Sequence, residues 1–295
     1  MTAPADALAV PATGWSLLTA GELLLLGAIW GGSFMLMRIA APAFGPLVLV
    51  ELRLGLGALV LLPFLWAARQ HLNARLLGAL AMVGIVNSAL PFALFAWSAT
   101  FAPAGISAIC NALAVLFTAI AATAFFGERL TPGRWLALAL GLLGVVLLAS
   151  ARIEGVDMPA AVAAGTLAAA LYGIGANLVR KYLATSLPSA AVAAATLGAA
   201  ALFMAPAAIW TWPTVMPDAK AWAAAITLGV VCTGAAFVLF YRLIRKIGAA
   251  RAVMVTYLIP LFGAGWAWWL LDEPVTLAMA AAGALILGSI AMSRR

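Results

Sequence analysis

Long apolar stretches, separated by short polar breaks, recur from one end of the chain to the other. An α-helix needs about 20 residues to cross the roughly 30 Å hydrocarbon core of a bilayer, and most of these stretches have that length. Ten segments are bounded by proline, glycine or charge. They cover approximately residues 20–40, 45–67, 75–98, 103–126, 132–150, 159–181, 188–211, 220–243, 248–271 and 275–293. Because the connections are only a few residues long, any function must reside in the helices and their ends.

The composition agrees with this pattern. Of 295 residues, 66% are hydrophobic and 8% are charged, whereas about a quarter of the residues of a soluble domain are charged. We therefore expect an all-α integral membrane protein in contact with the lipid bilayer. The net charge of +7 is not gathered on a soluble module, so no nucleic-acid partner is expected. The first 18 residues carry no Lys or Arg, unlike a cleavable signal, so the first apolar segment is expected to remain in the protein.

The loop charges predict an orientation. Lys and Arg are retained on the cytoplasmic side of a membrane. With the N-terminus inside, twelve of these residues fall on the inner side and three on the outer side. The inner set is Arg69, Arg75, Arg129, Arg134, Arg180, Lys181, Arg242, Arg245, Lys246, Arg251, Arg294 and Arg295, and the outer set is Arg38, Arg152 and Lys220. We expect a multi-pass protein of a bacterial inner (plasma) membrane with both termini in the cytoplasm.

The chain repeats itself. FFGERLT at 125–131 is matched by LLDEPVT at 270–276, and the whole of 84–131 aligns with 229–276. The aligned pairs are Gly84/Gly229, Phe92/Phe237, Phe95/Phe240, Leu113/Leu258, Phe117/Phe262, Glu128/Glu273 and Thr131/Thr276. WGGSFMLMR at 30–38 likewise lies over YGIGANLVR at 172–180, which pairs Gly31 with Gly173 and Arg38 with Arg180.

These matches predict a cytoplasmic N-terminal segment (1–19) followed by two five-helix repeats (20–150 and 155–295). Because five is odd, the second repeat enters the membrane from the opposite side, and the two form an inverted pair. We expect Glu128 and Glu273 each to open the next helix, where a carboxylate meets unpaired backbone N–H groups.

With WGGSF at 30–34, FGERLTPGRW at 126–135, LDEPVT and the five-plus-five spacing, the sequence resembles the drug/metabolite transporter superfamily, in its ten-helix branch of two EamA-type halves. Its nearest likeness within that branch is to bacterial aromatic amino-acid exporters. The resemblance implies a basket-like fold in which helices 1, 3, 4, 6, 8 and 9 surround a central cavity and helices 5 and 10 are peripheral. Small relatives use a glutamate in the first helix for proton exchange, but that place falls near Ala28 here. Glu22 lies at the helix start, so uniport is more plausible than antiport through that residue.

Polar and aromatic residues inside the segments are the candidate cavity lining, because such groups usually face a bundle interior or a wet path. They are Trp30, Ser33, Asn87, Trp97, Asn111, Tyr172, Asn177, Thr233 and Tyr257. For the hydroxyls the alternative is a bond to their own helix, and for the asparagines a bond between helices.

Arg38, Glu51 and Arg53 cluster towards the outer side, either as a structural ion pair or as an outer gate. Pro91 and Pro260 interrupt segments 3 and 9 and are candidate hinges.

The leading hypothesis is an exporter of small, largely apolar or zwitterionic metabolites, such as aromatic amino acids, that works by alternating access as a monomer. A drug or metabolite exporter with proton coupling is an alternative. A nucleotide-sugar or sugar-phosphate carrier is disfavoured because no Lys or Arg was placed at cavity depth. No enzyme is expected, since no catalytic pair or metal motif appears, and no cofactor or metal either. Cys110 and Cys232 are expected to be small buried hydrophobes.

Overall fold

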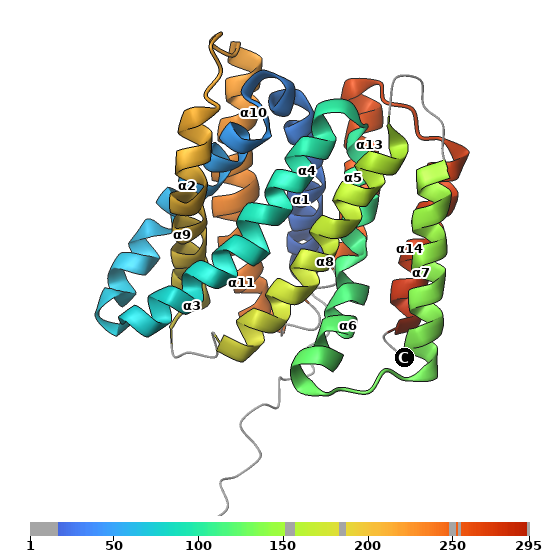
Figure 1. The fold of residues 1–295 in the computed structure, drawn as a ribbon, viewed down its shortest axis with the longest axis horizontal. Coiled ribbons are helices and arrows are strands. Elements are labelled where there is room, and N and C mark those ends of the chain that lie inside the picture. The colour runs from blue at the N-terminus through green and yellow to red at the C-terminus, as the bar shows by residue number, and fades with distance from the viewer. Residues whose placement is uncertain (1–16, 151–156, 183–186, 248–251, 253–254, 294–295) are drawn as a thin grey trace, which may run out of the picture.

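The computed structural model describes residues 17–150, 157–182, 187–247, 252 and 255–293. Within these ranges the protein consists of helices joined by short turns (Figure 1). The predicted cytoplasmic segment therefore falls almost entirely outside the described residues, as do Arg152, Arg251, Arg294 and Arg295.

The ten predicted segments are all helical where they are described. The first half contains α1 (Leu17–Phe44), α2 (Pro46–Ala68), the 3₁₀ turn η1 (Arg69–His71), α3 (Ala74–Gly84), the π-helix η2 (Ile85–Ala89), α4 (Leu90–Phe101), α5 (Ala104–Ala112), α6 (Ala114–Phe126) and α7 (Pro132–Ser150). The second half contains α8 (Met158–Tyr182), α9 (Ser189–Trp210), α10 (Ala219–Gly229), the π-helix η3 (Val230–Ala235), α11 (Ala236–Ile247), α13 (Val255–Leu271) and α14 (Leu277–Ser293).

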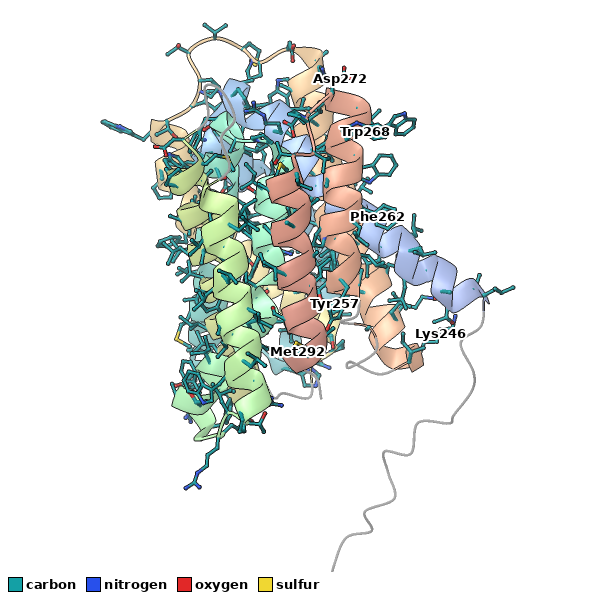
Figure 2. The ribbon with its side chains drawn as sticks, turned by 90° about the vertical axis from the view of Figure 1, so that its right-hand side faces the viewer. Lys246, Tyr257, Phe262, Trp268, Asp272 and Met292 are labelled. Carbon is teal, nitrogen blue, oxygen red and sulfur yellow. The ribbon has the colours of Figure 1, made fainter. Side chains whose placement is uncertain are left out.

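By length and composition, seven continuous helices can cross a membrane, and three shorter apolar helices, Pro132–Leu148, Val255–Leu271 and Leu277–Ser289, bring the described apolar helices to ten. Large apolar side chains are exposed on their outer faces, as at Leu59 and Leu202. Trp268 projects outward from α13 in the same way (Figure 2). The all-α membrane architecture predicted from the apolar pattern is confirmed.

The two halves are threaded in opposite directions. In Figure 1, α1 rises through the molecule whereas α8 descends. Figure 2 places Lys246 and Met292 at one end, called the lower end here, and Asp272 at the other, the upper end. Glu22, near the start of α1, is ion-paired to Lys246, so α1 begins at the lower end.

Crossed contacts between the halves follow the predicted alignment. A Cβ placed on Gly31 of α1 would lie 2.6 Å from the Cβ of Phe262 on α13. A Cβ on Gly173 of α8 would lie 2.7 Å from the Cβ of Phe117 on α6. Since the two glycines align with each other, as do the two phenylalanines, each half supplies the glycine for one close approach and the ring for the other. The helices α7 and α14 pack together at one side of the molecule (Figure 1), as expected for the fifth and tenth spans.

The repeated FFGERLT and LLDEPVT stretches build the same two helix ends. Gly127 (φ 65°) ends α6 and Asp272 (φ 53°) follows α13, both in the left-handed conformation that glycine and aspartate tolerate. The hydroxyl oxygens of Thr131 and Thr276 then accept hydrogen bonds from backbone N–H groups three residues on, which caps α7 and α14.

The expectation that Glu273 opens the next helix is wrong, because Thr276 caps α14 and the carboxylate serves another helix. Glu273 Oε2 accepts a hydrogen bond of 2.8 Å from the backbone N–H of Ala104, at the start of α5. The carboxylate does meet an unpaired N–H group at a helix start, as expected, but that helix begins about 170 residues away in sequence.

Spans 3 and 8 each contain a π-helical turn at equivalent positions, since Ile85–Ala89 and Val230–Ala235 start 145 residues apart. In span 3, Pro91 follows the wide turn and lacks the N–H that an α-helix would require there. In span 8, the Thr233 hydroxyl donates to the Leu228 carbonyl, five residues earlier. Wide turns of this kind are frequent at functional sites, and both lie beside the central cavity described next.

Candidate functional site: a central cavity between the repeats

A cavity of about 230 Å³ lies between the two halves. Its lining comes from the first, second, third, fourth, sixth, eighth and ninth spans. The six spans implied by the family resemblance are therefore all present, and α2 adds one further residue, Arg53. The volume lies below the roughly 300–1,000 Å³ typical of small-molecule sites, which suits a small solute.

Much of the lining comes in repeat-related pairs. Four pairs are separated by 145 positions, the offset of the sequence repeat, and the pair from the first and sixth spans by 142. The five pairs are Trp30/Tyr172, Asn87/Cys232, Phe92/Phe237, Asn111/Thr256 and Ala114/Ile259. The cavity thus lies on the pseudo-symmetry relation between the halves, where both repeats contribute the same positions with different side chains.

Two repeat-related aromatic clusters contribute to this site. In the first cluster, Tyr172 of α8 lies against Phe92 and Phe95 of α4, with ring centroids 6.4 and 6.0 Å away. In the second cluster, Trp30 of α1 lies against Phe237 and Phe240 of α11, at 6.2 and 5.1 Å. Five of these six rings line the cavity, Phe240 being the exception, so a flat apolar group would meet aromatic surface contributed by both halves.

The polar groups of the lining differ in how they are satisfied. The indole N–H of Trp30 donates to the backbone carbonyl of Cys232 (3.1 Å), within the wide turn of η3. Ser33 donates to the Trp30 carbonyl (2.6 Å) and is occupied within its own helix. The side-chain amides of Asn87 and Asn111 form no hydrogen bond to any described residue, and both face the cavity. Each therefore has donors and an acceptor available to a solute.

Other predicted lining residues lie elsewhere. Trp97 is 42% exposed and makes an edge-to-face contact with Phe101. Asn177 is buried and donates to the carbonyls of Thr118 (3.0 Å) and Gly173 (2.9 Å), which ties α8 to α6. Tyr257 packs against a separate apolar cluster around α5 and α14. These three side chains point away from the cavity around their helices, which the sequence pattern does not reveal.

Thr233 is fully buried behind the lining and accepts a hydrogen bond from Arg53 Nε (3.0 Å). Because its own hydroxyl hydrogen goes to Leu228, its lone pair is directed at the guanidinium. Thr233 therefore positions a lining residue instead of lining the cavity itself.

The predicted cluster of Arg38, Glu51 and Arg53 does not form. Residues two apart on a helix point in nearly opposite directions, so Glu51 and Arg53 of α2 cannot meet. Arg53 lies in the central cavity, which corrects its assignment to the outer end. Glu51 is partly buried, and its Oε2 has no hydrogen-bond partner.

Arg38 pairs with Glu273 instead, at the upper end. Its Nε lies 3.2 Å from Glu273 Oε1, and its Nη1 donates to the carbonyls of Ala99 (3.1 Å) and Thr100 (2.9 Å). With the Ala104 N–H bond, Glu273 joins the ends of three spans: α1, α5 and the turn after α13. Burial raises the pKa of the Glu273 carboxyl above its usual value, against the opposing effects of the Ala104 N–H and the Arg38 charge.

A second ionic group lies at the lower end of α1. Glu22 is 3.0 Å from Arg242 and 3.2 Å from Lys246, both on α11. No specific partner is expected for Glu22 from the sequence pattern. Side-chain ion pairs thus link α1 to the second half of the chain towards both of its ends.

Several lining residues were not among the candidates: Phe34, Met37, Ser88, Phe92, Phe95, Ala114, Val115, Cys232, Phe237, Thr256 and Ile259. The alignment held a usable signal for some of them, because Cys232, Phe237 and Thr256 are the repeat partners of Asn87, Phe92 and Asn111. The thiol of Cys232 is buried and unbridged, as expected, yet it belongs to the cavity wall. Of the candidate hinges, Pro91 follows a π-helical turn and Pro260 lies inside the continuous helix α13.

Two inverted helical repeats that enclose a cavity inside an apolar shell define a multi-pass membrane protein of the secondary-transporter class. The model of the EamA-like transporter family matches residues 17–150 and again residues 159–295, so the chain belongs to that family.

Named relatives agree with this class. A protein called "Uncharacterized transporter" from Archaeoglobus fulgidus is 24% identical over 90% of this chain and 94% of its own length. A "Probable amino-acid metabolite efflux pump" of Escherichia coli (strain K12) is 25% identical over 86% of this chain and 87% of its own. The "Uncharacterized inner membrane transporter YedA" of the same organism is 30% identical over 44% of this chain and 43% of its own. One solved crystal structure shares the fold, with a TM-score of 0.62 at 23% identity over 93% of this chain and 94% of that chain.

Proposed function

We propose that this protein is an inner-membrane exporter of small metabolites with an apolar, often aromatic, body, among them hydrophobic amino acids. The observation that carries the proposal is the cavity wall of repeat-related residues, with aromatic rings from both halves and the free amides of Asn87 and Asn111 from the first half. Such a wall suits a solute with a flat apolar part and a small polar part. A relative named as an amino-acid metabolite efflux pump supports the direction of transport and the type of solute.

Alternating access follows from the inverted repeats. If one half rocks against the other, a site between them opens to each side of the membrane in turn. Arg38–Glu273 at the upper end and Glu22 with Arg242 and Lys246 at the lower end are then the contacts that such a motion must break and form. In this proposal the Arg38–Glu273 pair is the outer gate, in place of the cluster expected from the sequence.

The orientation and the energy source belong to the same proposal. Described basic residues such as Arg75, Lys181 and Arg242 occur where the chain turns at the lower end, and by the positive-inside rule they support a cytoplasmic assignment for that end. The backbone carbonyl of Ala28 accepts a bond from the Trp266 indole (3.1 Å), so a neutral contact stands where small relatives have their proton-exchanging glutamate. We infer uniport down the gradient of the solute.

Reconstitution tests these points together. Purified protein in liposomes is given labelled Phe, Trp, Thr or a cationic dye, with and without a pH gradient or membrane potential. We expect saturable flux of Phe and Trp that persists without either gradient. Flux of the dye alone would refute the amino-acid assignment, and flux that requires a proton gradient would refute uniport in favour of the proton-coupled alternative.

The presence of Arg53 removes one reason for rejecting a nucleotide-sugar or sugar-phosphate carrier, namely the lack of a cavity cation. Size and charge still disfavour it. One guanidinium cannot neutralise a diphosphate, and a cavity of about 230 Å³ is small for a sugar joined to a nucleotide.

A further inference from the structure

Arg53 is the one charged side chain among the described residues of the cavity wall. Its side chain is almost entirely enclosed, with 7% of the residue exposed, and its Cζ lies 3.7 Å from the centroid of the Phe92 ring. A charge at this depth in a membrane protein is costly unless a partner offsets it, so such residues are functional by default.

The guanidinium is held firmly but is only partly satisfied. Nε donates to the Thr233 hydroxyl oxygen (3.0 Å), and Nη1 donates to the sulfur of Met37 (3.6 Å), a weak acceptor. Its Nη2 donates to no described residue. Arginine has five N–H donors, and most of those of Arg53 therefore remain for a ligand in the cavity.

The packing behind the arginine keeps it in this place. Gly57 lies one turn further along α2, and a Cβ there would be 2.7 Å from Cγ2 of Thr233. Absence of that Cβ lets α2 approach η3 closely enough for Arg53 to reach Thr233. The orientation of the guanidinium is therefore built into the contact between the second and eighth spans.

No described carboxylate forms an ion pair with Arg53. The pairs of Arg38 with Glu273 and of Glu22 with Arg242 and Lys246 lie at the two ends of α1 and leave Arg53 out. The described lining contains no Asp or Glu. A buried guanidinium without a carboxylate partner gains a large interaction energy when an anionic ligand supplies one.

We propose that Arg53 binds the carboxylate of the solute, and that the site prefers monocarboxylates with an apolar or aromatic body over zwitterions, neutral analogues and amines. This inference rests on the proposed transport function and specifies its substrate class. An ammonium group would find no acidic partner among the described lining residues and would be repelled by the guanidinium. The α-amino group of an amino acid thus adds nothing to binding here, while the carboxylate does.

Four compounds of similar shape test the preference on purified protein in detergent, by ligand-induced thermal stabilisation. They are 3-phenylpropionate (an anion), its neutral isostere 3-phenylpropanamide, phenylalanine (a zwitterion) and phenethylamine (a cation). We expect 3-phenylpropionate to bind about tenfold or more tightly than the amide, since a hydrogen bond to a charged group is the stronger one. Phenylalanine should follow the acid, and phenethylamine should bind most weakly.

Variants separate a ligand contact from a structural role. In Arg53→Gln the acid and the amide should bind within about twofold of each other, and Arg53→Lys should keep a reduced preference, because lysine offers no bidentate fork. Arg69→Gln is the matched control. Arg69 also lies over an aromatic ring, that of Trp66 at 4.6 Å, but on the exposed surface away from the cavity. Its substitution should leave the preference for the acid unchanged.

Equal binding of acid and amide to the wild-type protein, including no binding of either, overturns the inference. So does an Arg53→Gln protein that melts at a lower temperature yet keeps the wild-type preference for the acid, because Arg53 would then be structural. Flux of the same four compounds in liposomes is measured separately. Preferred binding of the acid without flux refutes the exporter function and leaves the carboxylate site. Flux that is the same with and without the carboxylate refutes the carboxylate site and leaves the exporter function.

Discussion

The two aromatic clusters are related by the repeat, each combining rings from both halves, yet they have different chemistry. The first cluster, around Tyr172, carries a buried cation over one ring, because Arg53 lies on Phe92. The second cluster, around Trp30, carries an indole bonded to a backbone carbonyl. The stretch of α9 that corresponds to Arg53 on α2 lies around Thr196 and Leu197 and bears no charge. The repeat therefore determines how the helices pack, and single substitutions within it determine what the cavity can bind.

The wide turns show the same division. Both occur at the same position in their repeats, but Pro91 follows the first and has Ala236 as its counterpart in the second. In the second wide turn, the Thr233 hydroxyl donates a hydrogen bond to the carbonyl five residues earlier. Equivalent backbone geometry is thus reached by two different local causes, which indicates that the geometry is what the two halves have in common.

The largest expected effect tests whether the two crossed glycine contacts are equivalent. Gly31→Ala and Gly173→Ala should each lower the free energy of unfolding by about 1–3 kcal/mol, because either Cβ would overlap the facing helix. Thermal melting in detergent measures this. Gly78→Ala is the control, since its Cβ would meet nothing within 4 Å, and it should be neutral or slightly stabilising. Similar melting temperatures for all three would mean that the close approach is absent.

A somewhat smaller effect is expected at the upper end. Glu273→Ala should cost about 1–2 kcal/mol, because it leaves the Ala104 N–H and Arg38 without their acceptor. Glu273→Gln keeps an oxygen at that N–H and should cost clearly less. The comparison is made by thermal melting at neutral pH, and equal losses in the two variants would show that the hydrogen bond to α5 does not matter.

The same carboxyl gives a pH dependence with a definite sign. Since burial raises the pKa of Glu273 above its ordinary value of 4.5, the folded protein binds this proton more tightly than the unfolded chain does. The contribution to stability is fully present below pH 4.5 and is lost as the pH rises through the raised pKa. Wild-type melting temperatures should therefore fall over that interval relative to those of Glu273→Gln, and parallel curves would contradict the assignment.

The two clusters should respond differently to loss of a polar atom. Trp30→Phe removes the hydrogen bond to Cys232 and should cost about 1 kcal/mol. Tyr172→Phe should cost less than about 0.5 kcal/mol, since the Tyr172 hydroxyl has no hydrogen bond to a described residue. Thermal melting distinguishes them, and a Tyr172→Phe protein as unstable as Trp30→Phe would contradict the assigned difference between the two clusters.

The smallest effect is expected at the lower end of α1. Glu22→Gln should change stability by less than about 0.5 kcal/mol, because the Arg242 and Lys246 side chains are 61% and 35% exposed and ion pairs with solvated cations contribute little, although Glu22 itself is only 12% exposed. The small wild-type advantage should disappear when the melting is repeated in about 1 M salt. An effect larger than that of Glu273→Ala would reverse the ranking of the two ends.

Much of the fold could be predicted from the sequence because membrane-spanning helices are specified by apolar length alone. The repeat could also be predicted, and the crossed contact of Gly31 with Phe262 shows why: residues that align between halves must occupy equivalent places in a pseudo-symmetric packing. Segment ends differed by a few residues, as where α1 extends to Leu17 and Phe44.

The site was only partly predictable. Burial depth can be read along a sequence, but the side of the helix cannot when nearly every residue is apolar, so Asn177 was grouped with Asn87 although it bonds between helices. The carboxylate of Glu273 serves a helix far away in sequence, and no local pattern indicates that. Arg53 was assigned by its depth alone, although a long side chain can place its charge well away from its own Cα.

The π-helical turns also bear on how spans 3 and 8 can change shape. A wide turn holds one residue more than an α-helical turn, and it can shift along its helix by exchanging one backbone hydrogen bond at a time. Each such step rotates the residues it passes by roughly 100° about the helix axis, the angle of one residue in a helix of 3.6 residues per turn. Asn87 and Cys232 stand inside these turns. Movement of a π-helical turn along its helix would thus change which side chains face the cavity, while the ends of the span stay in place.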